Sequence, residues 1–318
     1  MKISVVIPAY NRAATIRKCL DSVVLQTYLP DEILVVDDGS TDETVEAVSS
    51  YRHPPQISLR CLSLGRNSGA QAARNHGIRE AKGDWIAFQD SDDEWLPEKL
   101  EKQVAALGSV NFHPMTVIHA NCYRQSHRSG ERQAWALPEV AGESPFSRLL
   151  TSPGPLFPTI LTSKAALEKI GFLDENVPSY QEWDTALRLA KVCRFIHLRE
   201  PLFVYHLHAG ETISKSGSRD VEGYQFVVDK FRDDILRHCG SKVYNHHLVF
   251  NAVRAMEYGY FAKAEEILSR RVGFSAMIPQ IRLLVKMRIN PAKLRSWLNL
   301  PGRPQAILRR FLGIGTSS

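Results

Sequence analysis

The chain has 318 residues, 44% of them hydrophobic, which is enough to bury the core of one α/β domain and a smaller partner. Ten of the 40 basic residues and none of the 34 acidic ones follow Glu266, so residues 1–266 carry 30 basic and 34 acidic residues, a net of −4, although the whole chain has a net of +6. Five scattered cysteines without a CxxC pair argue against a disulfide framework and a zinc site, and no apolar stretch reaches the ~18 residues that span a bilayer.

The first 110 residues alternate short apolar runs with amphipathic segments. The apolar runs predict strands buried on both faces, and the segments between them predict helices. In chain order we expect strands at 3–7, 32–36, 57–62 and 85–89. The first helix between them would have Asn11 as its N-cap, and the second would begin with a capping box of Ser40 and Glu43. The third would cover 69–82 and be closed by Gly83, and a fourth would follow the last strand from about Pro97. This order predicts a parallel, doubly wound α/β sheet.

The remaining residues predict further strands and then a helical region. Residues 111–162 are less regular, with strand candidates at 116–123 and 157–162. The patterns then predict a helix at 182–192, strands at 194–198 and 202–207, and helices near 220–238, 242–257, 260–271 and 276–288. We therefore expect an α/β domain over residues 1–215 and a helical, basic C-terminal region over residues 216–318.

Acidic side chains follow two of the predicted strands. Asp37 and Asp38 end the second strand, and Asp90 and Asp92 follow the fourth, with Ser91 between them. In such sheets the ligand site lies outside the carboxyl ends of the strands. Two carboxylates one residue apart can hold magnesium or manganese and leave positions for phosphate oxygens. The alternative is that both acidic runs are solvated turns that cap the following helices, since this spacing is common in turns.

Several segments in a fixed order resemble the family 2 glycosyltransferases, which have the GT-A fold. The resemblance covers about residues 1–215 and is carried by Pro8–Asn11, Val35–Asp42, Gly69–Ile78 and Gly83–Asp93. It implies a Rossmann-like sheet and a nucleotide-sugar donor, and it favours a metal site over a simple turn at Asp90 and Asp92.

The resemblance also implies roles for single residues. It places Pro8, Tyr10 and Asn11 along the nucleotide, and Asp38 and also Asp37 at the base. It places Arg74 and Asn75 near the donor, Asp90 at the ribose or sugar, and Asp92 on the metal, with Ser91 as a further donor-binding residue. A histidine near a small-residue turn contacts a phosphate or the metal in relatives, and His208 fits that position better than His206.

A base for the acceptor hydroxyl is expected at the start of the helix near 182. Relatives carry an acidic pair there, which is Gln181 and Glu182 in this chain, so only the second carboxylate is kept. We expect Glu182 to be the general base, with Asp184 as the second candidate. The alternative is that these acids only favour a helix N-terminus.

Together these features predict an inverting glycosyltransferase that uses a nucleotide-diphosphate sugar, UDP-linked by preference, with Mg or Mn. The acceptor would be a glycan or lipid-linked hydroxyl in surface polysaccharide or glycolipid synthesis. The basic C-terminal region predicts a cytoplasmic protein that is peripheral on the inner face of the cell membrane. The alternatives are a catalytically degenerate nucleotide-sugar-binding module and a nucleotidyltransferase. An oxidoreductase is disfavoured because the first turn lacks GxGxxG, and no nucleic-acid partner is expected.

Overall fold

The computed structural model describes the chain except for residues 127–128, 143–144, 208–216, 276 and 292–318. The strands are β1 (Ile3–Ala9), β2 (Glu32–Asp37), β3 (Ser58–Ser63), β4 (Trp85–Phe88), β5 (Glu94–Trp95), β6 (Thr116–Ser126), β7 (Arg132–Trp135), β8 (Leu161–Ser163) and β9 (Arg194–Leu207). The helices that accompany them are α1 (Ile16–Val24), α2 (Thr44–Ser49), α3 (Ala70–Glu80), α4 (Lys99–Gly108), α5 (Phe146–Leu149), the 3-10 turn η1 (Phe157–Thr159), α6 (Lys164–Lys169) and α7 (Gln181–Ala190).

Two compact units are present. The α/β unit contains Met1–Val177 and, among the described residues, 181–207. The helical unit contains Pro178–Tyr180 together with α8 (Gly217–Lys230), α9 (Arg232–His238), α10 (Gly240–Glu257), α11 (Phe261–Ser269) and α12 (Met277–Lys286). The boundary that we predicted after residue 215 lies outside the described residues, and it stays a prediction.

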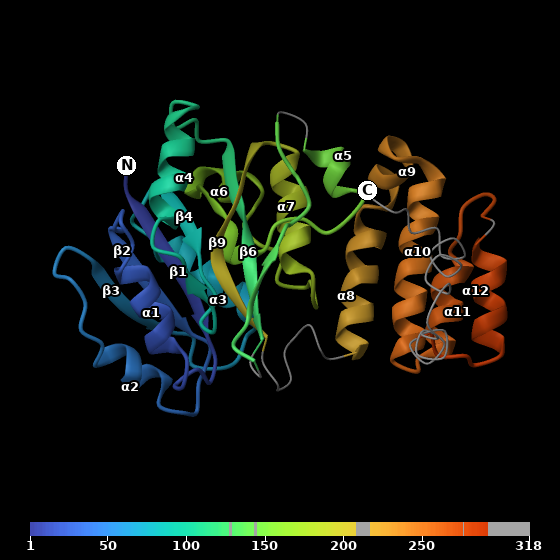
Figure 1. The fold of residues 1–318 in the computed structure, drawn as a ribbon, viewed down its shortest axis with the longest axis horizontal. Helices are drawn as coiled ribbons and strands as arrows, with labels where there is room; N and C mark the ends of the chain where they lie inside the picture. The colour runs from blue at the N-terminus through green and yellow to red at the C-terminus, as the bar shows by residue number, and fades with distance from the viewer. Residues whose placement is uncertain (127–128, 143–144, 208–216, 276, 292–318) are drawn as a thin grey trace. The chain divides into compact units, whose positions relative to one another are not determined.

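The α/β unit is built on one sheet with the strand order β3-β2-β1-β4-β8-β6-β9-β5, and β7 pairs with β6 (Figure 1). The strands β3, β2, β1 and β4 are parallel, as the sequence predicts. Beyond them, β8 runs antiparallel to both β4 and β6, whereas β6 and β9 are parallel. The carboxyl ends of β1, β2 and β4 therefore meet at one edge of the sheet, where Tyr10, Asp38 and Asp90 follow them.

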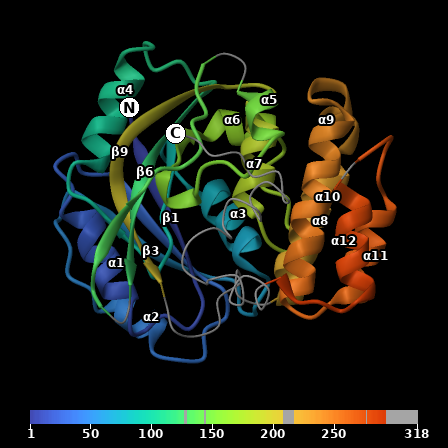
Figure 2. The same ribbon diagram turned by 45° about the vertical axis from the view of Figure 1, so that its right-hand side comes forward.

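Helices lie on both faces of the sheet (Figure 2), and apolar residues of the strands pack against them. Ile3, Val5 and Ile7 of β1 belong to a buried cluster that also includes apolar residues of α1 and α4. Val6 faces the other way and lies under α3, whose Gly77 comes so close that a Cβ there would lie 2.6 Å from Cγ1 of Val6. Because alternate residues of a strand point to opposite faces, one continuous apolar run anchors both helical layers.

Two predicted helix caps are wrong. Asn11 does not cap α1, which begins five residues later after Thr15. Asn11 instead adopts a left-handed conformation with φ of 51°, and its Oδ1 accepts a hydrogen bond from the amide of Thr41 at 2.8 Å. The capping box is also absent, because Ser40 Oγ accepts from the amide of Asn11 at 2.9 Å and α2 begins after Glu43. Both side chains tie the turn after β1 to the turn after β2.

Two further predictions need correction. Gly83 does not close α3 by a left-handed turn, since that helix ends at Glu80 and Ala81 is extended. Gly83 is required for close approach, because a Cβ there would lie 2.5 Å from Ser4 Oγ and 2.9 Å from the carbonyl oxygen of Lys2. The two short strands predicted at 194–198 and 202–207 are one strand, β9, with register shifts against β6 near Asn121.

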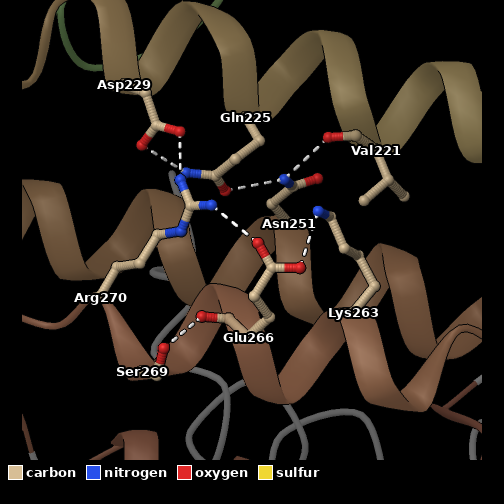
Figure 3. Close-up of polar contacts among 8 residues, drawn as sticks. All are labelled: Val221, Gln225, Asp229, Asn251, Lys263, Glu266, Ser269 and Arg270. Carbon is tan, nitrogen blue, oxygen red and sulfur yellow. Dashed lines mark hydrogen bonds and ion pairs between the residues drawn. The ribbon is translucent and has the colours of Figure 1, made fainter.

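A chain of polar contacts connects helices of the helical unit (Figure 3). Arg270 after α11 forms ion pairs with Asp229 of α8 and with Glu266 of α11. Asn251 of α10 donates to Gln225 of α8 at 3.1 Å, and Gln225 donates to Asp229 at 2.9 Å. These contacts join three helices. Within the described residues, none of the helices is both long and apolar enough to cross a membrane.

Replacing Gly77 by alanine is expected to destabilise the α/β unit. The new methyl group would meet Val6 at 2.6 Å and Val36 at 3.1 Å, so α3 would have to move away from the sheet. We expect the free energy of unfolding to fall by about 1–3 kcal/mol, as for other overpacked cores. Gly108→Ala in α4 is the matched control, because a Cβ there would meet only Phe112 at 3.7 Å. Equal stability of the two variants in urea denaturation would contradict this packing.

Candidate active site

The carboxylates at the end of β2 are held by backbone amides. Both oxygens of Asp37 accept from the amide of Ser40, at 3.2 and 3.3 Å. Asp38 accepts from the amides of Ser68 and Gly69 at 2.6 and 2.8 Å, immediately before α3. Each acid is 3% exposed. Both acids therefore fix loops at the sheet edge, and their predicted contact with the nucleotide base stays a prediction.

Asp90 pairs with Arg74, which α3 presents from its buried side. Nη2 of Arg74 lies 2.6 Å from Oδ1 of Asp90, and Nη1 donates to Gln71 at 2.9 Å. The guanidinium carbon is also 4.2 Å from the ring centroid of Phe157, which supports it from η1. Burial raises the pKa of Asp90, Arg74 opposes that rise, and neighbouring Asp92 adds to it. Arg74 and Asp90 thus form an ion pair at the sheet edge, and their predicted contacts with the donor stay predictions.

Asp92 pairs with Arg12, a residue that sequence analysis did not single out. Their closest atoms, Nη2 and Oδ2, are 3.3 Å apart. The amide of Arg12 donates to Thr44 Oγ1 at 2.7 Å, so the first residue of α2 fixes its backbone. The sequence did carry a signal for Arg12, because this cation comes shortly after β1, a strand that ends at the predicted ligand edge. Arg12 and Arg74 thus bring two positive charges to the acidic run 90–92.

Two more acids follow the 90–92 run. Asp93 accepts from the amide of His206 at 2.9 Å, and burial raises its pKa well above the ordinary value, with Asp90 and Asp92 adding to the rise. Glu94 pairs with His206 and with Lys18. His206 is therefore part of this acidic edge of the sheet. The histidine that we preferred, His208, lies outside the described residues, and its role stays a prediction.

The two candidate bases on α7 have different surroundings. Asp184 is fully buried and lies 3.8 Å from Nη1 of Arg188 on the next turn. Glu182 is only half-buried. Burial raises the pKa of Glu182, a backbone hydrogen bond and the positive charge of Arg74 lower it, and the negative charge of Asp90 raises it. Glu182 therefore shares the electrostatic environment of the Arg74–Asp90 pair.

The structure gives a reason for the amide at position 181. Nε2 of Gln181 donates to the carbonyl oxygen of Val177 at 3.1 Å. An ionised carboxylate cannot donate such a bond, so the acid that relatives carry here could not close this turn in the same way. Gln181 therefore differs from the family pattern at a residue that makes a structural contact before α7. The carboxylate of Glu182 is unaffected by this difference.

The other predicted donor residues lie at or behind the same edge. Pro8 is buried in β1, whereas Tyr10 after it is 42% exposed. Ser91 is buried between the two aspartates. Asn75 is 2% exposed, and its amide group exchanges two hydrogen bonds with the backbone of Leu173, each at 2.9 Å. Asn75 therefore holds the loop after α6, and its predicted donor contact stays a prediction.

The acidic run fits a divalent cation that is only partly coordinated by protein. Asp90 and Asp92 offer hard oxygen ligands. Burial raises the pKa values of Asp90 and Asp93, and neighbouring carboxylates add to both rises. Among the residues that the structure describes, no group of three or more His, Cys, Asp or Glu side chains forms a metal-binding set. Magnesium bound with nucleotide phosphates usually takes one or two carboxylates and completes its shell with phosphate and water oxygens.

Sequence comparison agrees with this geometry. The model of the family described as glycosyl transferase family 2 matches residues 4–148. An uncharacterized glycosyltransferase of Haemophilus influenzae is 30% identical over 242 residues, which cover 74% of this chain and 77% of the relative. The chain belongs to glycosyl transferase family 2. The uncharacterized glycosyltransferase YwdF of Bacillus subtilis is 31% identical over 198 residues, 60% of this chain and 69% of the relative.

Solved structures show the same GT-A-type fold. The S. aureus protein TarS, residues 1–349 in complex with UDP-GlcNAc, superposes with a TM-score of 0.65 at 19% identity, over 91% of this chain and 88% of that one. The mannosyltransferase PcManGT of Pyrobaculum calidifontis, in complex with GDP-Man and Mn²⁺, gives a TM-score of 0.58 at 19% identity, over 98% and 84%. The α/β unit of this family 2 enzyme thus has the predicted architecture, and the chain is a glycosyltransferase.

Replacing Asn75 by alanine is expected to lower the stability of the α/β unit. The backbone N–H and carbonyl of Leu173 would lose their buried partners, which costs about 1–3 kcal/mol in the free energy of unfolding. His76→Ala, at the neighbouring half-buried position, is the control. Thermal unfolding measures both variants, and an unchanged midpoint for Asn75→Ala would show that these two bonds contribute nothing.

Proposed function

We propose that the chain is an inverting glycosyltransferase that moves a sugar from a UDP-linked donor to an acceptor hydroxyl. The observation that supports this most is the grouping of one half-buried carboxylate, Glu182, with the Arg74–Asp90 ion pair. A base beside a cluster that can receive a sugar diphosphate is the arrangement that single displacement at an anomeric carbon requires. Family membership favours this reaction over the nucleotidyltransferase and the non-catalytic sugar-nucleotide-binding module.

Glu182 would act as the general base. Its raised pKa brings the proton affinity of the carboxylate closer to that of a useful base near neutral pH. It would take the proton of the acceptor hydroxyl as the hydroxyl oxygen bonds to the anomeric carbon. The bond from that carbon to the diphosphate breaks on the opposite face, so the configuration inverts. Asp184 is a poor alternative because it is fully buried beside Arg188.

Asp92, with Asp90 beside it, would hold the divalent cation, magnesium or manganese. The cation would neutralise the charge that develops on the leaving diphosphate. Arg12 and Arg74, whose guanidinium groups already lie at these carboxylates, would add positive charge on the protein side. The Mn²⁺ named with PcManGT supports this choice of metal.

The donor would lie along the carboxyl ends of β1, β2 and β4. We place the exposed ring of Tyr10 against the base, and the donor's ribose or sugar near Asp90. The wider donor set keeps the residues named from the family pattern, which are Pro8, Asn11, Asp37, Asp38, Asn75 and Ser91. A UDP-sugar is our first choice because TarS is described in complex with UDP-GlcNAc, and the GDP-Man of PcManGT is the natural comparison.

The acceptor would be a glycan or lipid-linked hydroxyl of a surface polysaccharide or glycolipid, reached from the cytoplasmic side. All five cysteines are free thiols, which supports a reducing compartment. On and near α12, Phe274, Leu283 and Met287 are 86%, 58% and 60% exposed, and Lys286 and Arg288 are exposed between or beside them. Apolar and basic side chains together suit the surface of an anionic membrane.

Replacing Glu182 by glutamine is expected to lower kcat by about 10²–10⁴-fold, the usual contribution of a general base. Asp184→Asn is the control and should change stability more than kcat. Because the base must be ionised and its pKa is raised, activity should fall with decreasing pH at values above the ordinary glutamate pKa. The measurement is nucleoside-diphosphate release from UDP-GlcNAc or GDP-mannose with MnCl₂, using water or an alkyl glycoside as acceptor. Full kcat in Glu182→Gln would remove Glu182 as the base.

Membrane attachment is tested by flotation of the protein with vesicles. We expect the chain to float with vesicles that contain phosphatidylglycerol and not with pure phosphatidylcholine, because the exposed basic residues need anionic headgroups. The double variant Leu283→Ser, Met287→Ser should bind several-fold less, whereas Leu25→Ser, an exposed leucine of the α/β unit, should bind normally. Equal flotation of all three proteins would contradict this surface.

A further inference from the structure

The short turn at Pro178–Tyr180, directly before α7, makes its contacts with the helical unit. Ser179 Oγ donates to the carbonyl oxygen of Arg219 at 2.9 Å. The hydroxyl of Tyr180 donates to Oδ1 of Asp220 at 3.0 Å, and its ring lies edge-on to Tyr224 with centroids 5.2 Å apart. The next residue of the chain is the first of α7, and Glu182 follows it.

Tyr180 is held in a strained conformation. Its φ is +59°, a left-handed value that bulky residues rarely adopt. Such a conformation persists only where the surroundings determine it strongly, and it is found most often at functional sites. The surroundings here are the partners of Tyr180 on α8, and burial raises the pKa of its hydroxyl, so the group stays a neutral donor.

Asp220 is the residue of α8 that accepts the hydrogen bond from Tyr180. It is 2% exposed on α8 and accepts from Nε of Arg254 at 2.9 Å and from the hydroxyl of Tyr258 at 3.3 Å, besides the bond from Tyr180. A buried carboxylate with this many donors is rigid, because losing any one of them leaves charge or polar groups unsatisfied. The position of the Tyr180 hydroxyl is therefore determined by α8 and α10.

Gly223 brings the turn directly onto α8. A Cβ at this position would lie 2.0 Å from Oγ of Ser179 and 2.5 Å from its backbone nitrogen. The helix has no left-handed residue here, so the glycine serves close approach alone. One methyl group at position 223 would push the turn away without removing any polar group.

We infer that Tyr180, Asp220 and Gly223 are positioning residues for the general base, and that the helical unit holds the turn from which α7 starts. The inference rests on the proposed role of Glu182. Gln181, the first residue of α7, also closes this turn by its bond to the carbonyl oxygen of Val177. A displacement of about 1 Å in a catalytic group can reduce the rate about 10²-fold.

A variant that displaces the turn before α7 is therefore expected to lower kcat without changing donor binding. The residues proposed to hold UDP lie at the ends of β1, β2 and β4, and Tyr180 is not among them. Displacing the turn should therefore slow proton removal from the acceptor and leave the affinity for UDP unchanged. A role that only stabilises the fold would weaken both or neither.

The experiment compares Gly223→Ala and Tyr180→Phe with the control Gly108→Ala. For each full-length variant we measure kcat with the donor that the parent protein uses, UDP-GlcNAc or GDP-mannose, and the Kd for the matching nucleoside diphosphate with Mn²⁺ by calorimetry. We expect kcat to fall about tenfold to a hundredfold in Gly223→Ala and less in Tyr180→Phe, with Kd changed less than about twofold. Tyr180→Phe removes one hydroxyl and keeps the ring, so it tests the same separation if Gly223→Ala does not fold.

Unchanged kcat in Tyr180→Phe together with unchanged kcat in Gly223→Ala would overturn the inference, and so would a loss of affinity as large as the loss of kcat. Glu182→Gln, measured in parallel, separates the two proposals. If Glu182→Gln keeps full kcat, the base assignment fails and the inference fails with it. If Glu182→Gln is inactive while the two turn variants keep full kcat, only the inference fails.

Discussion

The ion pair between Arg74 and Asp90 is the interaction on which the rest of the site depends. α3 can present Arg74 at the edge of the sheet because Gly77, three residues later, lets the helix lie close on β1 and β2. The ring of Phe157 lies 4.2 Å from the guanidinium carbon, and Asp90 accepts from the guanidinium at 2.6 Å. A half-buried carboxylate is thereby kept beside Asp92 despite the repulsion between them. The charge balance at this edge then acts on Glu182, which lies outside the motif that brings Asp90 and Asp92 together.

This arrangement explains how two acids two residues apart on α7 differ in their proposed roles. Asp184 is enclosed and paired with Arg188, which in turn donates to the carbonyl of Phe172 at 2.7 Å. It anchors the helix to the loop before it. The charges of Arg74 and Asp90 act on the pKa of Glu182, and the amide of Gln181 closes the turn before it. We therefore interpret Gln181, which stands where relatives carry an acid, as a structural residue. Glu182 remains the proposed general base.

Sequence analysis predicted the elements well where the pattern is local. Apolar runs gave β1 to β4, and the acids that follow them do lie at one edge, because parallel strands end together. Sequence analysis failed where a side chain forms a hydrogen bond to a residue distant in sequence. Asn11 and Ser40 were predicted to be helix caps, but each forms a hydrogen bond with the other's turn, about 30 residues away. Phe157 and Tyr180 were missed for the same reason, since their partners on other elements leave no spacing that a local pattern can detect. Arg12 was also missed, although its position shortly after β1 was an available signal.

We expect Arg74 and Asp90 to act as one unit in the donor site. A double-mutant cycle measures their coupling, with the Kd for UDP and Mn²⁺ determined by calorimetry for Arg74→Met, Asp90→Asn and the double variant. We predict that the effects are not additive, with a coupling free energy of about 0.5–3 kcal/mol, because each single change leaves the other group without its partner. Additive effects, with each residue changing the affinity independently, would contradict the account.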